Sequence, residues 1–142
     1  FEQWQLNDRI AALGTTLGNA LLAPHRSYLP DFTRLREASV QIKAMVHVTG
    51  GGLVDNPARV LPEGTAMHID KSSWAVPPLF ALIKSQGNVE ETEMYRAFNM
   101  GIGMLFVVPA DEKQLALSHL GEDARVVGKI VARSQDPVEL VP

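Results

Sequence analysis

The stretch MVHVTGGGLVDNPARVLP, Met45–Pro62, joins a strand-like pattern to a helix-like pattern through three consecutive glycines. Before the glycines, residues 42–49 alternate side chains with the period of two that predicts a β-strand. Glycine permits positive φ and leaves free the space that a Cβ would fill. A helix that follows would offer unpaired N–H groups to an anion. Three glycines at this place favour an anion-binding turn, and a tight turn that only serves packing is the alternative.

Two better-known phosphate-binding motifs are excluded at this turn. No GK[ST] follows the glycines, and the G-x-G-x-x-G spacing of a dinucleotide site is absent. Arg59 and His47 lie close in sequence and could add a charge or a hydrogen bond to a bound anion. The residues alone thus predict a phosphate-binding domain and identify no catalytic acid or base.

A second glycine pair, Gly101 and Gly103, lies in the run FNMGIGM. We predict a buried strand over residues 100–108, with both glycines on one face. Glycine inside a strand marks close approach by a ligand or by another part of the backbone. Packing explains this pair as well as ligand binding does.

The rest of the pattern predicts a chain in which strands alternate with helices. The fold class is therefore α/β or α+β around one sheet. The tail DPVELVP is expected to be frayed, and Asp31 is expected to cap a short helix. Further strands are predicted at 65–70 and 124–132, helices at 77–87, 90–98 and 111–120, and an irregular or helical segment at 6–22.

Composition limits the classes of function that the chain can have. The chain has 142 residues, enough for one domain, and 13 Lys+Arg against 16 Asp+Glu give a net charge of −3. This balance argues against a general nucleic-acid or membrane binder. With no cysteine and no metal-binding spacing among the histidines, no metal site is expected. The N-terminus lacks the form of a signal peptide, so a cytoplasmic location is expected, and the start at Phe1 suggests a piece of a longer polypeptide.

Five segments occur in a family-specific order: APHRSYL, HVTGGGLVDNPARVLPEG, DKSSWAVPPLF, MYRAFNMGIGM and VVGKIV. This order resembles the C-terminal domain of the aminoimidazole ribonucleotide synthetase family, also called phosphoribosylformylglycinamidine cyclo-ligases. The resemblance covers nearly the whole chain. It departs at His25, where the family usually has threonine, at Ser27, where it has an aliphatic residue, and at N-P-A-R, residues 56–59, where it often reads N-I-P-R.

The resemblance implies that residues 1–142 are a single substrate-binding domain of a two-domain enzyme. Such enzymes convert formylglycinamidine ribonucleotide and ATP to aminoimidazole ribonucleotide, ADP and phosphate in purine biosynthesis. An N-terminal domain, absent here, would bind most of the ATP and Mg²⁺ and form the main contact of a homodimer. The fold would be a mixed, mainly antiparallel sheet with helices packed on it and a partial ferredoxin-like topology. The isolated chain is expected to be inactive.

The resemblance also implies which residues meet the substrate phosphate. Thr49, Gly50, Gly51 and Gly52 would contact it directly. A second group would line the same cleft: His47, Asn56, Arg59, Asn99, Gly101 and Gly103. Two alternatives remain, namely another enzyme of the same ATP-dependent superfamily and a non-catalytic module that binds a phosphorylated metabolite for regulation.

Overall fold

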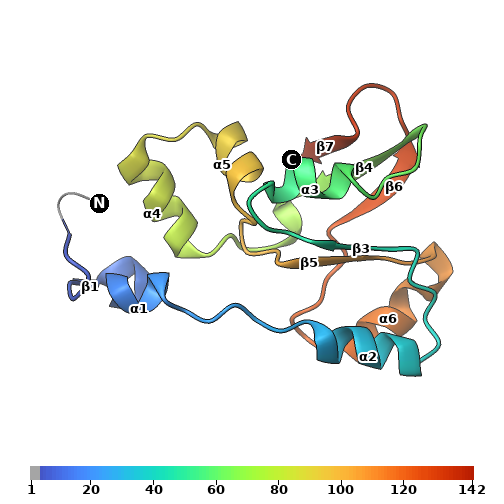
Figure 1. The fold of residues 1–142 in the computed structure, drawn as a ribbon, viewed down its shortest axis with the longest axis horizontal. Coiled ribbons are helices and arrows are strands. Elements are labelled where there is room, and N and C mark those ends of the chain that lie inside the picture. The colour runs from blue at the N-terminus through green and yellow to red at the C-terminus, as the bar shows by residue number, and fades with distance from the viewer. Residues whose placement is uncertain (1–3) are drawn as a thin grey trace.

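A two-stranded antiparallel ribbon runs through the middle of the molecule (Figure 1). It pairs β3 (Ala44–His47) with β5 (Met104–Val107), and His47 lies directly opposite Met104. One face of the ribbon is buried in the main core. The other face is partly open, and it carries His47 and Met104.

The computed structural model describes residues 4–142, so the first three residues of the expected domain 1–142 lie outside the described part. The remaining strands are β1 (Arg9–Ile10), β2 (Thr15–Thr16), β4 (Thr65–Asp70), β6 (Gly128–Ala132) and β7 (Val138–Val141). The α-helices are α1 (Leu17–Leu21), α2 (Leu29–Glu37), α3 (Gly52–Ala58), α4 (Pro78–Gly87), α5 (Glu91–Ala97) and α6 (Lys113–Leu120). Short 3₁₀ helices occupy Ala11–Leu13, Lys71–Ser73 and Ala110–Glu112.

A mixed three-stranded sheet in the order β6-β4-β7 forms the second layer. The pairing of β4 with β6 is antiparallel, and that of β4 with β7 is parallel. His68 and Glu139 lie opposite each other on the paired strands, with Nε2 of His68 3.1 Å from a carboxylate oxygen of Glu139. His68 is therefore a satisfied sheet histidine, as its pattern predicts. The expected mixed, mainly antiparallel α/β class is confirmed, but the strands form three small sheets rather than one.

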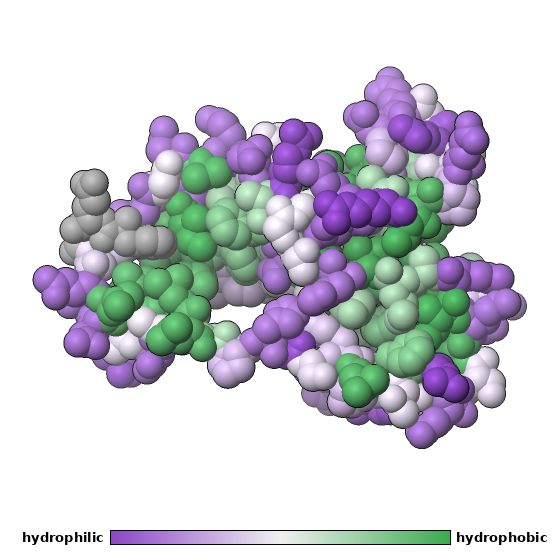
Figure 2. All heavy atoms as spheres, in the orientation of Figure 1, coloured by the Kyte–Doolittle hydropathy of each residue, from purple (hydrophilic) through white to green (hydrophobic). Residues whose placement is uncertain are grey.

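Two hydrophobic clusters hold these layers together. The main cluster joins the inner face of the ribbon to the three-stranded sheet and to α3 and α5, through residues such as Val46, Ile69 and Met94. A smaller cluster packs α2 against α6, which lie side by side beneath the ribbon in Figure 1. At the N-terminal end, Figure 2 shows hydrophobic side chains gathered over α1, where Leu21 and Leu22 are exposed.

The structure corrects three predictions about the elements. Strand β5 begins only at Met104, because Met100 and Gly101 have positive φ values of 51° and 98° and form a turn. Gly101 and Gly103 therefore precede the strand and do not share one of its faces. The expected capping role of Asp31 is wrong, since α2 already begins at Leu29 with a proline in its first turn, where proline is tolerated.

The C-terminal tail is also not frayed. Its apolar residues form β7, which lies parallel to β4 with Val138 opposite Met67. The last predicted strand begins at Gly128 rather than at Ala124. Strand β4 and helices α4 and α5 lie within one residue of their predicted bounds.

Candidate functional site

The glycine turn links the end of β3 to the start of α3, as the sequence predicts. The N–H of Val48 donates to the carbonyl of Gly103 (3.0 Å), which continues the ribbon by one residue. The turn then closes through the N–H of Gly52, which donates to the carbonyl of Thr49 (2.9 Å). Thr49 and Gly50 are left exposed at its tip.

The three glycines of the turn differ in what surrounds them. Gly52 has a φ of +55°, and a Cβ there would lie 2.2 Å from the carbonyl oxygen of Tyr95, so this glycine lets α3 pack against the end of α5. At Gly51, a Cβ would lie 2.5 Å from Nδ2 of Asn56. At Gly50, a Cβ would meet nothing within 4 Å. Packing thus accounts for Gly51 and Gly52, and only Gly50 opens the turn to an approaching molecule.

Asn56 braces this turn from within α3. Its side chain is buried, and Oδ1 accepts a hydrogen bond of 2.7 Å from the N–H of Thr49. That amide is therefore occupied by the protein itself. Among residues 4–142, the structure gives the N–H groups of Gly50 and Gly51 no acceptor, so these two amides are the donors that the turn can offer to a ligand.

A hollow of about 190 Å³ opens beside the turn. Thr49, Asn56 and Arg59 line it together with His47 at the end of β3. Within the described part of the chain, the exposed guanidinium of Arg59 has no carboxylate or carbonyl partner, so its charge is available to a ligand. Two free backbone amides and one arginine suit a small anion such as phosphate.

A larger hollow of about 420 Å³ lies on the other side of His47, over the open face of the ribbon. Its walls include His25 and Tyr28 from the extended segment between α1 and α2. Nε2 of His25 lies 2.9 Å from Nε2 of His47. Tyr28 lies over Gly103, where a Cβ would be 2.0 Å from the phenol oxygen, so Gly103 is a glycine because of this contact.

The sequence reasoning did not include His25 and Tyr28 among the site residues. The run APHRSYL carried them, but no periodicity indicates that this segment crosses the ribbon.

Two further residues that were expected in the cleft have local structural roles instead. Oδ1 of Asn99 accepts from the N–H of Gly101 (3.0 Å), and together they form the turn before β5. A Cβ at Gly101 would lie 2.5 Å from Pro77 at the start of α4. In the described structure, neither Asn99 nor Gly101 lines either hollow.

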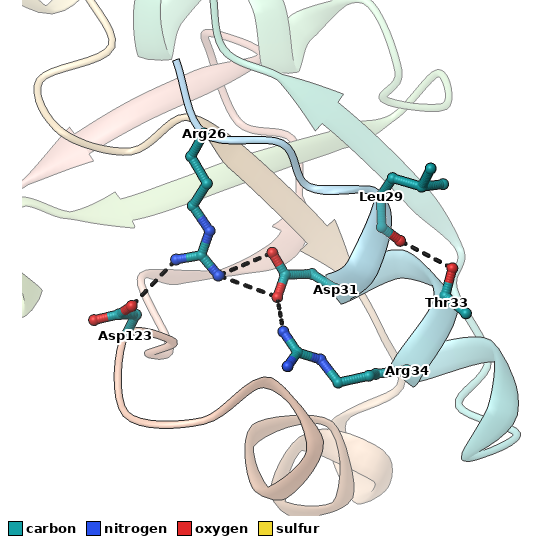
Figure 3. Close-up of polar contacts among 6 residues, drawn as sticks. All are labelled: Arg26, Leu29, Asp31, Thr33, Arg34 and Asp123. Atoms are coloured by element: carbon teal, nitrogen blue, oxygen red, sulfur yellow. Dashed lines mark hydrogen bonds and ion pairs between the residues drawn. The ribbon is translucent and has the colours of Figure 1, made fainter. Parts of the chain in front are cut away.

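A buried carboxylate anchors the segment that carries His25 and Tyr28. Asp31 accepts hydrogen bonds of 3.0 and 3.1 Å from Arg26, and Arg34 donates to the same carboxylate from the next turn of α2 (Figure 3). The other guanidinium nitrogen of Arg26 reaches Asp123 after α6, at 3.2 Å. This network fixes the wall of the larger hollow to α2 and to the chain after α6.

Residues 4–142 contain no group of three or more His, Asp or Glu side chains that could hold a metal ion. The described part of the chain thus does not itself fit a Mg²⁺ site of carboxylates. Among the same residues, no helix has the length and apolar character needed to cross a bilayer.

Residues 2–140 match the family of AIR synthase related proteins, C-terminal domain. The chain belongs to this family. The match runs from before β1 to Leu140 within β7, so the glycine turn and both hollows lie inside the family's domain.

Curated relatives agree with this assignment. A phosphoribosylformylglycinamidine cyclo-ligase of Thermoanaerobacter sp. (strain X514) is 45% identical over 131 residues, which are 90% of this chain and 38% of the relative. That of Syntrophotalea carbinolica is 43% identical over 141 residues, 96% of this chain and 40% of the relative. The chain thus spans about two fifths of the length of these relatives.

One solved structure shows the same fold at greater distance. The crystal structure of E. coli HypE, a hydrogenase maturation protein, matches with a TM-score of 0.59 over 88% of this chain and 41% of HypE. The identity is 23%, so the likeness concerns the fold alone.

Proposed function

We propose that this chain is the C-terminal, substrate-binding domain of a phosphoribosylformylglycinamidine cyclo-ligase. The observation that carries the proposal is its identity of 40–45% with relatives of that name over about nine tenths of the chain. In the whole enzyme, the domain would form one wall of the site where formylglycinamidine ribonucleotide is closed to aminoimidazole ribonucleotide with ATP.

The substrate's 5′-phosphate is proposed to sit in the smaller hollow, against the glycine turn. Thr49 lines this hollow, and the free amides of Gly50 and Gly51, which follow it in the turn, would donate to the phosphate oxygens. Arg59, also in the lining, would supply the opposite charge. His47 stands at the rim as a further donor. Gly52 and Asn56 would act indirectly, because they hold the turn in the shape that exposes these amides.

The residues that were expected to line the cleft have different roles in this proposal. Gly103 supports the site by making room for Tyr28, whereas Asn99 and Gly101 shape the turn before β5. Helix α3 has only seven residues and carries Asp55 in its first turn, so its dipole would contribute little. The proposed site therefore depends on the turn amides and on Arg59.

Other parts of the whole enzyme would supply the nucleotide chemistry. We propose that a preceding N-terminal domain binds ATP and Mg²⁺, that the full-length protein is a homodimer, and that it works in the cytoplasm. Phosphoryl transfer depends mainly on positioning and on charge stabilisation by metal ions. The described residues would contribute binding and orientation of the ribonucleotide.

An NMR titration of the ¹⁵N-labelled chain tests the phosphate site. Ribose 5-phosphate and formylglycinamide ribonucleotide should cause saturable shifts centred on the amides of residues 49–53, and ATP should cause little change there. Gly50→Ala is the sharpest variant, because its methyl group meets no protein atom within 4 Å yet occupies the proposed approach of the ligand. It should keep the fold and weaken binding of both ribose phosphates.

Arg59→Gln should weaken binding as well, since it removes the proposed charge. Arg125→Gln is the matched control, because Arg125 is exposed and lines neither hollow. Equal affinities for wild type, Gly50→Ala and Arg59→Gln would refute the proposed phosphate site. The same titration on a full-length protein would show whether binding requires the other domain.

A further inference from the structure

Two histidines from distant parts of the chain meet in the larger hollow. His25 lies on the extended segment before α2, and His47 is the last residue of β3. Their Nε2 atoms are 2.9 Å apart, and their ring centroids are 5.0 Å apart. Both rings are exposed, so they have room to turn toward an incoming group.

This separation also fits two imidazoles that share one metal ion. With metal–nitrogen bonds of about 2.0–2.1 Å, a nitrogen separation of 2.9 Å gives an angle of about 90° at the metal. Because both rings are exposed and can turn, the separation shows that the two nitrogens can reach one ion, and the metal is decided by the other donors.

Thioether groups lie on the same face of the ribbon. Met104 is directly opposite His47 across the strand pair, and Met45 precedes His47 by two residues on the same strand face. Both methionines line the hollow together with the two histidines. Directly paired side chains have Cβ atoms about 4.5–5.5 Å apart, and methionine is flexible enough to adjust its sulfur.

The donor set decides which metal fits the pair. In the described structure, no third histidine or carboxylate completes the pair, so the remaining ligands would be thioether sulfur and water. Soft sulfur together with imidazole favours copper, which also leads the divalent first-row ions in affinity for nitrogen sites.

We propose that His25 and His47 bind one copper ion through their Nε2 atoms, with Met104 as a neighbouring thioether ligand and Met45 within reach. In the metal-free state, the same two nitrogens share a hydrogen bond, in which one ring donates and the other accepts. Binding would replace the shared proton by the metal and tie the segment before α2 to the end of β3. This site lies in the larger hollow and shares His47 with the rim of the proposed phosphate site, but it does not depend on the proposed function.

Titration of the chain with Cu²⁺, followed by electron paramagnetic resonance, is the first test. The wild type should bind one ion per chain, with hyperfine structure from two imidazole nitrogens. His25→Gln and His47→Gln should each lower the affinity at least about tenfold, since loss of even an indirect partner of a metal ligand costs 10–100-fold. His119→Gln is the matched control and should bind like the wild type, because His119 is an exposed histidine on α6, far along the chain from the pair.

Equal binding by the wild type and by both pair variants would overturn the proposal and would indicate adventitious copper. Zn²⁺ should bind more weakly than Cu²⁺, and Mg²⁺ should not displace either ion. Cu⁺ binding in the absence of oxygen, measured by competition with a chromogenic chelator, tests the thioether ligand. Met104→Leu should weaken Cu⁺ binding. An unchanged affinity would remove Met104 from the site. Circular dichroism of each variant checks that the fold is kept.

Discussion

The tyrosine beneath the glycine turn shows how one buried residue links the site to stability. Tyr95 is buried in the main core, and its carbonyl oxygen faces Gly52. Burial disfavours the charged phenolate and raises the pKa of Tyr95 above its ordinary value of 10.0, while the nearby Lys71 lowers it in part.

This shift predicts how stability depends on alkaline pH. The folded chain holds the Tyr95 proton more tightly than the unfolded chain does. The resulting contribution to the free energy of unfolding is complete below pH 10 and is lost as pH rises through the higher pKa of the folded state. Tyr28→Phe leaves Tyr95 as the single tyrosine, and its tyrosinate absorbance should therefore appear above pH 10. A midpoint at or below 10 in the folded variant would contradict the prediction.

At the residue scale, the sequence predicts the glycine turn but does not show which of its glycines serve packing and which leaves the turn open. The pattern of three glycines after a strand is visible in the chain, and the structure places it where expected. The contacts of Gly52 with the backbone of α5 and of Gly51 with Asn56 depend on tertiary packing. For the same reason the approach of His25 to His47, from 22 residues earlier, could not be predicted.

Helix α2 and the segment before it depend on a single carboxylate. Asp31 has only 5% of its side chain exposed and joins Arg26 to Arg34, whereas Asp123, the other partner of Arg26, is 84% exposed. Asp31→Asn should lower the free energy of unfolding by about 1–3 kcal/mol, because the amide leaves two charged donors imperfectly paired. Urea denaturation measures the change.

Asp123, the second carboxylate partner of Arg26, offers a control for this prediction. Asp123→Asn removes an exposed partner of the same arginine, and an exposed ion pair contributes at most about 1 kcal/mol. If Asp31→Asn costs no more than Asp123→Asn, the buried carboxylate does not anchor the segment. Stability should then be compared at high salt, where the contribution of Asp123 is screened first.

Elements were predictable where the local pattern decided the structure. Strand β4 has a clear turn before it and helix α4 opens with two prolines, so their bounds agree with expectation. Strand β7 was not predictable, because a short apolar tail becomes a strand only by pairing with β4, far away in the sequence. The turn before β5 was mistaken for strand, because the positive φ of Met100 leaves no mark in an apolar run.

At the scale of the whole molecule, the chain should not complete the proposed reaction alone. It spans about two fifths of the length of the relatives, and residues 4–142 contain no group of three His, Asp or Glu side chains that could hold a metal. Transfer of a phosphoryl group needs metal ions and several positioned charges around the nucleotide. Among the described residues, the smaller hollow carries one unpaired guanidinium, that of Arg59, and the larger one carries Arg26, which is paired with Asp31, so the hollows do not supply these charges.

The measurement is ADP release from ATP in the presence of formylglycinamidine ribonucleotide. The 142-residue chain should give no more ADP than a blank without protein. The full-length cyclo-ligase of Thermoanaerobacter sp. (strain X514), assayed in parallel, should give steady turnover and so validates the substrate. Release above the blank by the chain alone would contradict the prediction, because it would mean that these residues position both ATP and its metal ions.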